Sequence, residues 1–323
     1  MIETILIAGC GNFGSWWAAG CERHSEVVSI TIYDPATNNI ELICERIKIL
    51  RNDEATKRKS ILYIKNMESL ASRYDLIVVS CNSKERLSLF EALKAKTSSS
   101  TWVLEKVLAS NSNDIHRMLI LSEDMDVYVN HSRRMQPLWQ LFNIYRHDFA
   151  KINMIDQSLG MWELASNSFH FAEVISWSFN TRIGKCDIIR SSWRESRTRK
   201  GYYDFDGSME FRYENGLVHN LSQDLCSNSN LFEFVSIDSE GKKEVCMSLD
   251  EGLGYIQIDK NKKIKIEFIA WSKLVCTFLD SIVKGEASLP RIETVYESNL
   301  EILQVLEKDF KNTYSSIKEF KIS

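Results

Sequence analysis

In the first part of the chain, short apolar runs alternate with segments of helical periodicity. The strand-like runs are TILIAG (4–9), VVSITIYD (27–34), DLIVVSC (75–81), TWVLE (101–105) and DVYVN (126–130). The helical segments between them include FGSWWAAGCER, NIELICERIKIL and KERLSLFEALKA. Because the strands are continuously apolar and separated by helices, they predict a parallel sheet buried on both faces.

From about residue 183 the pattern changes to strands joined by turns. The strands lie in KCDIIRSSW, SMEFRYENGLVHNLS, LFEFVSIDSEGKKEVCMSL and YIQIDKNKKIKIEFI. Glu-Asn-Gly at 214–216 and Ser-Glu-Gly at 239–241 are typical of hairpin turns. Helical patterns at 271–284 and 293–312 close the chain.

A chain of 323 residues is long for a single hydrophobic core, so we expect two domains. The change of pattern divides them near residue 130. Residues 1–129 would form an α/β domain with a doubly wound parallel sheet. Residues 130–323 would form an α+β domain with a largely antiparallel open sheet.

Charge and cysteine spacing exclude several functions. A net charge of −4 and a pI near 6.0 argue against nonspecific nucleic-acid binding, which needs a basic surface. The 8 cysteines contain no C-x-x-C pair, so we expect neither a metal site nor a disulfide framework, and reduced thiols are consistent with a cytosol. No apolar run approaches the roughly 18 residues of a membrane span, and no cleavable leader is visible. We therefore expect a cytoplasmic protein without a nucleic-acid or membrane partner.

A glycine-rich turn, in IAGCGNFGSW, follows the first strand and opens the first helix. Gly9 permits the tight turn, Gly11 lets the backbone approach a pyrophosphate, and Gly14 lets helix and strand pack closely. The pyrophosphate would lie on the amides at the helix N-terminus, beside Asn12 and Phe13. The turn alone is weak evidence, because methyltransferases carry similar turns. Its place between a strand and a helix favours a dinucleotide.

An acidic residue, Asp34, ends the second strand about twenty residues beyond the turn. An acid at this place accepts hydrogen bonds from the adenosine ribose and repels a 2′-phosphate, which favours NAD over NADP. Asp34 is also consistent with a turn or N-cap residue before Pro35. The turn and the acid together predict a Rossmann dinucleotide-binding domain.

Glu105 and Lys106 end the strand TWVLE, at the edge where open α/β sheets bind ligands. At this point the chain resembles the glucose–fructose oxidoreductase / inositol 2-dehydrogenase (Gfo/Idh/MocA) family, whose members carry an E-K-P motif here. The resemblance implies that Lys106 is catalytic or polarises the substrate and that Glu105 lies by the cofactor. Val107 replaces the proline, which in the family often forms a cis peptide that shapes the loop.

The resemblance covers most of the chain. SCNSKE stands where the family has T-P-N-x-x-H, which implies that Ser80, Cys81 and Asn82 contact the cofactor, whereas Glu85 replaces the histidine. NHSRRMQP resembles the R-x-x-P segment that opens the second domain, and this places Arg134 near the substrate.

SNSFHFAE resembles the family's D-x-G-x-H-x-x-D segment. On that alignment His170 matches the catalytic histidine, Ser166 replaces the first aspartate and Glu173 replaces the second. Ser166 or Asn167 would then position His170 or a second substrate hydroxyl. GMWELASNSFH looks like a branch of the family that is linked to bacterial surface-polysaccharide biosynthesis.

The helical geometry of this segment bears on whether His170 moves protons. With about 100° per residue, the polar or aromatic side chains within about 60° of His170 are Ser166, Asn167, Glu173 and Trp177. We expect the opposite, apolar face to be buried and the His170 face to line a cleft. A lone helical histidine is more often structural. The dinucleotide turn and the Glu-Lys pair favour a functional histidine here.

These features predict an NAD-dependent oxidoreductase acting on a hydroxyl or keto carbon of a sugar, sugar acid or nucleotide-activated sugar. His170 would exchange the hydroxyl proton, since imidazole has a pKa of about 6.5, and Lys106 would stabilise the alkoxide. One rival is a noncatalytic NAD-binding sensor or partner protein of the same fold, which the changes at Glu85, Val107 and Ser166 support. A methyltransferase is a second rival, disfavoured by the Glu-Lys pair and the β-rich second half.

Two further features bear on partners. A basic stretch contains Arg190, Arg194, Arg197, Arg199 and Lys200. It is either a clamp for an anionic substrate group, with Arg197 in contact, or a solvated edge strand protected by charge. An exposed face of the β-rich sheet, the usual dimer surface in the resembling family, predicts a homodimer or homotetramer.

Overall fold

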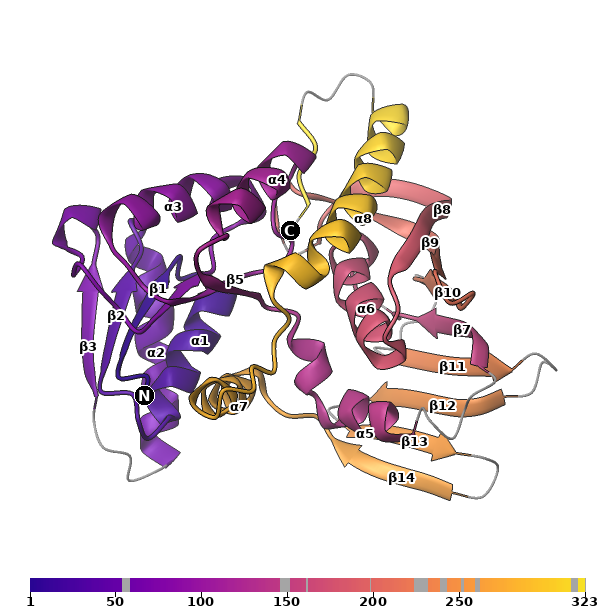
Figure 1. Ribbon diagram of the computed structural model, residues 1–323, viewed down its shortest axis with the longest axis horizontal. Coiled ribbons are helices and arrows are strands. Elements are labelled where there is room, and N and C mark those ends of the chain that lie inside the picture. The colour runs from indigo at the N-terminus through magenta and orange to yellow at the C-terminus, as the bar shows by residue number, and fades with distance from the viewer. Residues whose placement is uncertain are drawn as a thin grey trace. The chain divides into compact units, whose positions relative to one another are not determined.

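The computed structural model describes residues 1–53, 59–145, 152–160, 162–197, 199–223, 232–238, 243–250, 253–258, 262–314 and 319–322. The chain forms two compact units. The first contains Met1–Ala109, Asn113–Asn130 and Ile269–Val295. The second contains Ser110–Ser112, His131–Phe268 and Tyr296–Ser323. Each unit has its own sheet (Figure 1).

The first unit is built on a six-stranded parallel sheet in the order β3-β2-β1-β4-β5-β6. Its strands are β1 (Thr4–Ala8), β2 (Ser29–Tyr33), β3 (Ser60–Ile64), β4 (Leu76–Val79), β5 (Thr101–Leu104) and β6 (Asp126–Val129). Every side chain of β4 and β5 is buried, which explains their continuously apolar sequences. The predicted doubly wound parallel sheet is confirmed. Its strand order reverses between β1 and β4, the point where such sheets bind ligands.

Helices cover both faces of this sheet (Figure 1). They are α1 (Asn12–Arg23), α2 (Thr37–Asp53), α3 (Ser83–Lys96), α4 (Ser112–Leu121) and α7 (Trp271–Val283). Helix α1 starts directly at the glycine-rich turn and α3 starts directly after β4. The N-termini of both helices therefore lie at the carboxyl ends of neighbouring strands.

Helix α7 comes late in the chain but packs with the first unit. Trp17 of α1 meets Phe278 of α7 edge to face, with ring centroids 5.8 Å apart. A Cβ added at Gly20 would lie 2.4 Å from the Cβ of Val275, so only glycine permits this close helix contact. The expected division into 1–129 and 130–323 has a single boundary, whereas the chain returns to the first unit at 269–295 because α7 covers α1.

The second unit contains an eight-stranded sheet in the order β14-β13-β12-β11-β7-β10-β9-β8. Its strands are β7 (Ile152–Ser158), β8 (Ile183–Glu195), β9 (Tyr203–Tyr213), β10 (Val218–Ser222), β11 (Phe232–Asp238), β12 (Lys243–Asp250), β13 (Leu253–Ile258) and β14 (Lys262–Glu267). Strand β10 pairs with β7 in parallel, and the other neighbours pair antiparallel. The predicted, largely antiparallel sheet is confirmed.

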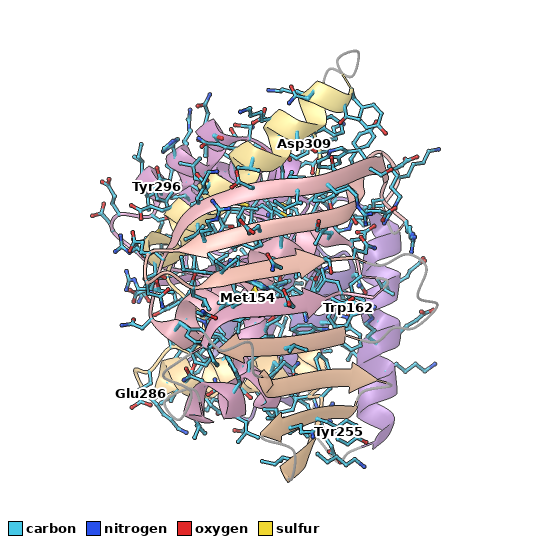
Figure 2. All side chains as sticks on the ribbon, turned by 90° about the vertical axis from the view of Figure 1, so that its right-hand side faces the viewer. Met154, Trp162, Tyr255, Glu286, Tyr296 and Asp309 are labelled. Carbon is cyan, nitrogen blue, oxygen red and sulfur yellow. The ribbon has the colours of Figure 1, made fainter. Side chains whose placement is uncertain are left out.

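Helices α5 (Pro137–Tyr145) and α6 (Leu164–Phe179) contact this sheet. The hydroxyl of Tyr213 on β9 donates to the carbonyl of Ala172 on α6 over 3.3 Å. Figure 2 looks onto the opposite sheet face, where Met154 and Tyr255 lie. The short helix η2 (Ser132–Met135) precedes α5, and α8 (Ile292–Thr313) is the last helix described.

The elements that the sequence pattern leaves out are irregular or peripheral. Strand β3 is an edge strand and β7 carries polar residues in INMIDQS, so neither shows an uninterrupted apolar run. The predicted turn at 214–216 is confirmed, with Gly216 at φ +86° between β9 and β10. The turn at 239–241 lies outside the described residues. No helix in the described part of the chain is long and apolar enough to cross a membrane.

Candidate functional site

The glycine-rich turn is tightly packed at its first and third glycines. Gly9 has φ +86°, and a Cβ there would lie 2.5 Å from the backbone nitrogen of Cys81. A Cβ at Gly14 would lie 2.2 Å from the carbonyl oxygen of Gly9. A side chain at either position would push α1 away from the ends of β1 and β4, so the turn requires both glycines.

Gly11 differs, because space beside it is open. It is the N-cap of α1, and a Cβ there would meet no other atom within 4 Å. No side chain caps this helix end, so its first amides point toward the opening. An anionic group fits this place, where the helix dipole and the free N–H groups both attract negative charge.

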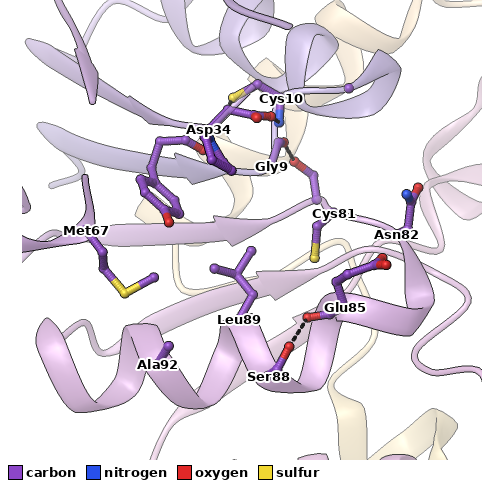
Figure 3. Close-up of a pocket in the computed structure, with 14 residues that line it drawn as sticks. Gly9, Cys10, Asp34, Met67, Cys81, Asn82, Glu85, Ser88, Leu89 and Ala92 are labelled. Carbon is purple, nitrogen blue, oxygen red and sulfur yellow. Dashed lines mark hydrogen bonds between the residues drawn. The ribbon is translucent and has the colours of Figure 1, made fainter. Parts of the chain in front are cut away.

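A cavity of about 430 Å³ lies beside this turn (Figure 3). Its lining comes from the ends of β1, β2 and β4 and from one face of α3. The lining residues are Gly9, Cys10, Gly11, Tyr33, Asp34, Pro35, Met67, Ser80, Cys81, Asn82, Glu85, Ser88, Leu89 and Ala92. The apolar side chains at one end suit a flat aromatic base, and the turn amides and Asp34 suit polar groups.

Asp34 is buried at the end of β2 and lines this cavity. Its carboxylate accepts hydrogen bonds from the amide of Cys10 over 2.6 Å and from the amide of Ala36 over 2.8 Å. The second bond makes Asp34 a turn residue before the next helix, and the first ties it to the glycine-rich turn. The structure therefore gives this side chain a turn role and also a place in the cavity.

The other predicted cofactor residues near the turn occupy different places. Ser80 donates from its hydroxyl to the carbonyl of Gly9, and Asn82 is the exposed N-cap of α3. Burial raises the pKa of the Cys81 thiol to about 11, so it lines the cavity as a neutral group. Asn12 turns away from the cavity, because Arg46 donates to its side-chain oxygen over 2.6 Å. Phe13 is half-buried and does not line the cavity.

Glu105 faces the interior of the first unit. Its Oε1 accepts from the indole of Trp17 over 3.0 Å and from the amide of Asn130 over 2.6 Å. Burial raises the pKa of this carboxyl, and the two hydrogen bonds oppose the rise. Asn130 follows β6, so Glu105 holds the ends of β5 and β6 together. This placement favours a supporting role over direct contact with a cofactor.

Lys106 is half-buried on the loop after β5, and its peptide bond to Val107 is cis. Buried Arg86 on α3 holds this loop: its guanidinium donates to the carbonyls of Val107 and Leu108 and to that of Cys81 after β4. The role of Arg86 was not predicted from the sequence. Its only sequence signal is a charge at a buried position of a helix.

In the second unit, helix η2 and its N-cap lie along one face of α6. His131 meets His170 edge to face, with ring centroids 5.5 Å apart. The guanidinium of Arg133 donates to the side-chain oxygen of Asn167 over 2.9 Å. The two residues of α6 that receive these contacts, Asn167 and His170, are three positions apart in the helix.

A third contact of the same face joins Arg134 to Glu173 in a buried ion pair. Arg134 also lies 5.4 Å from the ring centroid of Trp177. Burial lowers the pKa of Arg134 to about 9, so this guanidinium stays charged at neutral pH. The predicted set of Asn167, His170 and Glu173 therefore lies together on one helix face.

Helix α6 is buried on both faces, which differs from the expectation of an open polar face. His170 is 5% exposed and Glu173 is 3% exposed, close to the 1% of Phe169 on the opposite face. The polar face is covered because Arg133 and Arg134 reach over it. Ser166 is also buried, at 7% exposed.

A carboxylate fixes the start of α6. Buried Asp204 on β9 accepts from the amides of Leu164 and Ala165, over 3.1 and 2.6 Å. Arg194, from the predicted basic stretch, lies 3.6 Å from Asp204 and 3.0 Å from Asp206. This arginine neutralises neighbouring acids of its own hairpin.

Two other arginines of the basic stretch lie at the surface. Arg197 is exposed, and its backbone amide donates to Glu163 over 2.9 Å. Arg190 is also exposed. The arrangement around Arg194 and Arg197 favours the edge-strand interpretation over a clamp. Among the described residues, no group of three His, Cys, Asp or Glu side chains could hold a metal ion.

Comparisons with known proteins give a fold-level result. No protein-family model matches the sequence, and no curated protein matches it. Solved structures match over nearly the whole chain. An oxidoreductase from Agrobacterium radiobacter, in complex with NAD+, L-tartaric acid and magnesium, is 13% identical with a TM-score of 0.63, over 98% of this chain and 97% of its own.

Two other similar structures differ in function. UDP-N-acetylglucosamine 3-dehydrogenase GnnA from Acidithiobacillus ferrooxidans is 12% identical with a TM-score of 0.63, over 94% of this chain and 97% of its own. The transcriptional regulator Gal80p from Kluyveromyces lactis is 14% identical with a TM-score of 0.66, over 95% of this chain and 92% of its own. At these identities the similarity establishes the fold, which enzymes and a regulator share.

Proposed function

We propose that this chain is an NAD-dependent oxidoreductase acting on a hydroxyl or keto carbon of a sugar or sugar derivative. The observation that carries the proposal is the cavity beside the glycine-rich turn, with open space at Gly11 and an acid at the end of β2. The similar oxidoreductase with NAD+ and the similar nucleotide-sugar dehydrogenase support it at the level of fold.

The residues of the cavity fit NAD. The free amides at Gly11 would hold the pyrophosphate, and the apolar side chains Met67, Leu89 and Ala92 would hold the adenine. Asp34 would accept from the ribose and repel a 2′-phosphate, which favours NAD over NADP. Bound NAD would supply the hydride acceptor, or NADH the donor.

Two side chains would carry the proton chemistry. His170 would take the proton from the substrate hydroxyl during oxidation and return it during reduction. Lys106 would stabilise the negative charge that develops on the same oxygen. Ser166 and Asn167, one turn before His170, would orient the imidazole or a second hydroxyl. These four roles are part of the proposal.

Replacement of Gly11 by valine tests the cofactor site directly. A Cβ at this position would meet no other atom within 4 Å, so we expect the fold to be retained, but the valine side chain would occupy the space at the helix N-terminus. We expect Gly11→Val to weaken NADH binding by about 10-fold or more, with an unchanged melting temperature. Fluorescence titration with NADH measures this, with Gly184→Ala as a control on β8. NADH affinity unchanged in Gly11→Val would contradict the proposed site.

A second candidate is a noncatalytic NAD-binding sensor or partner protein. The fold shared with the regulator Gal80p favours it, as do Glu85, Val107 and Ser166 in place of the family's usual residues. This candidate predicts NADH binding without turnover of any polyol or nucleotide sugar, and indifference to Lys106→Ala. A thermal-shift comparison of NADH with S-adenosylmethionine would separate both candidates from a methyltransferase.

A further inference from the structure

Arg133 on η2 is a buried arginine that lies against two aromatic rings. It is 7% exposed. Its guanidinium carbon lies 4.3 Å from the ring centroid of Phe171 and 4.6 Å from that of Trp162. Contacts of this kind with aromatic rings provide no hydrogen-bond acceptor for the N–H donors of the guanidinium.

The edge of this guanidinium is largely unused. One of its nitrogens donates to Asn167, and its Nε, which is buried, has no hydrogen-bond partner. No carboxylate lies within ion-pair distance of Arg133 among the residues that the structure describes. Burial lowers the pKa of this group to about 9, so it is charged at neutral pH. Among the described residues, the second unit therefore buries a positive charge without a counter-charge.

The neighbouring arginines behave differently. Arg134 has Glu173 as its partner, and Arg194 has Asp204 and Asp206. A buried charge without a partner is costly, and proteins retain it where a ligand supplies the opposite charge. The neutral oxygen of Asn167 orients the guanidinium without cancelling its charge.

The positive charge of Arg133 lies near His170, the proposed proton acceptor. Asn167, which Arg133 contacts, precedes His170 by three residues on the same face of α6. His131, two residues before Arg133, packs on the ring of His170. An anion bound at the Arg133 edge would lie within about a helical turn of the proposed proton acceptor.

We propose that Arg133 binds an anionic group of the substrate, a carboxylate or a phosphate. The inference rests on the proposed function, since it names the substrate class of the same site: a sugar acid, a sugar phosphate or a nucleotide-linked sugar. The planar donors of the guanidinium match both oxyanions. The substrate then supplies the counter-charge that the described residues do not give Arg133.

Matched probes test this class. Binding of D-glucuronate, D-glucose 6-phosphate, UDP-glucose and neutral D-glucose to the NADH-loaded protein is measured by calorimetry. We expect at least one charged probe to bind about 10-fold or more tightly than glucose. Hydrogen bonds to a charged group contribute enough binding free energy for a difference of this size. The probe that binds more tightly than glucose shows whether Arg133 binds a carboxylate, a phosphate or a diphosphate. If no charged probe binds more tightly than glucose, the proposal is overturned.

Two substitutions locate the effect. Arg133→Gln removes the charge and should abolish the preference for the charged probe. Arg133→Lys keeps the charge without the planar fork and should keep part of the preference, which remains informative if Arg133→Gln does not fold. Arg182→Gln, an exposed charge of the same unit, is the control and should bind like the wild type. A preference that survives in folded Arg133→Gln would overturn the proposal.

The same experiment separates this inference from the proposed function. Oxidation of glucose with no preference for charged probes would overturn the anion site and leave the oxidoreductase proposal intact. Arg133-dependent binding of a charged probe, with no hydride transfer to or from any compound of that class, would support the anion site and count against the oxidoreductase.

Discussion

His219 shows, at the scale of a single residue, how burial decides the charge of a side chain. Its ring lies fully buried on β10, 2.9 Å from the side-chain oxygen of Gln157 and 3.4 Å from the hydroxyl of Tyr213. Burial lowers its pKa from 6.5 to about 3. The folded protein therefore keeps this histidine neutral over the range in which the unfolded chain takes up a proton.

This depressed pKa predicts a loss of stability in acid. The stabilisation is present above pH 6.5 and is lost as the pH falls toward 3, because the unfolded state gains the proton first. From pH 7 to pH 5, His219 should account for a loss of about 2 kcal/mol in the free energy of unfolding. Urea unfolding at both pH values measures it. His219→Gln should lose less stability than the wild type between these pH values. His116→Gln, on the surface of α4, is the control and should lose as much as the wild type. Equal losses in the wild type and both variants would count against this role of His219.

The sequence singled out several residues that lie around the cavity and missed two buried arginines. The glycines of the turn and Asp34 were found because a turn requires a fixed spacing and backbone conformation. Arg133 and Arg86 were missed, since charged residues are ordinarily exposed and the pattern of one segment does not show what packs against it. Only the packing of η2 on α6, or of α3 against two loops, reveals their roles.

At the scale of elements, Arg86 connects α3 to the loops that follow β4 and β5. Its guanidinium donates to three backbone carbonyls and so fixes the loop that carries Lys106. We regard Arg86 as a positioning residue. The sequence predicts α3 and both strands, but not the side chain that ties them together.

Removal of this side chain should affect turnover more than cofactor binding. We expect Arg86→Ala to lower kcat by about 10- to 100-fold and to lower the melting temperature, because buried carbonyls lose their donors. Arg86→Lys, which can reach fewer carbonyls, should recover part of the activity, and the pH profile of kcat should shift if Lys106 moves. Arg117→Ala on α4 is the control. Unchanged kcat and an unchanged pH profile in folded Arg86→Ala would refute the positioning role.

Secondary structure followed the apolar pattern closely where the pattern was regular. Central strands such as β4 and β5, buried on both faces, have the continuous runs that predicted them. Strands β3 and β7 were missed because an edge position and a mixed polar sequence weaken the pattern. The open polar face expected for α6 was wrong, since periodicity on one helix contains no information about what packs against it.

At the scale of the whole molecule, the sequence predicted the two sheet types and their order along the chain. It could not predict that α7 returns to the first unit, because that contact depends on Gly20 and Val275, which lie far apart in sequence. The homodimer or homotetramer stays a prediction. So do the roles of Lys106 and His170 in the proton chemistry.

Hydride transfer in a His170→Ala variant is the most stringent test of the proposed oxidoreductase activity. The measurement is the rate of NADH formation or consumption with a substrate that the wild type turns over, together with the dissociation constant for NADH. The account predicts a fall in turnover of about 100-fold or more with NADH affinity nearly unchanged. Turnover equal to that of the wild type would contradict it.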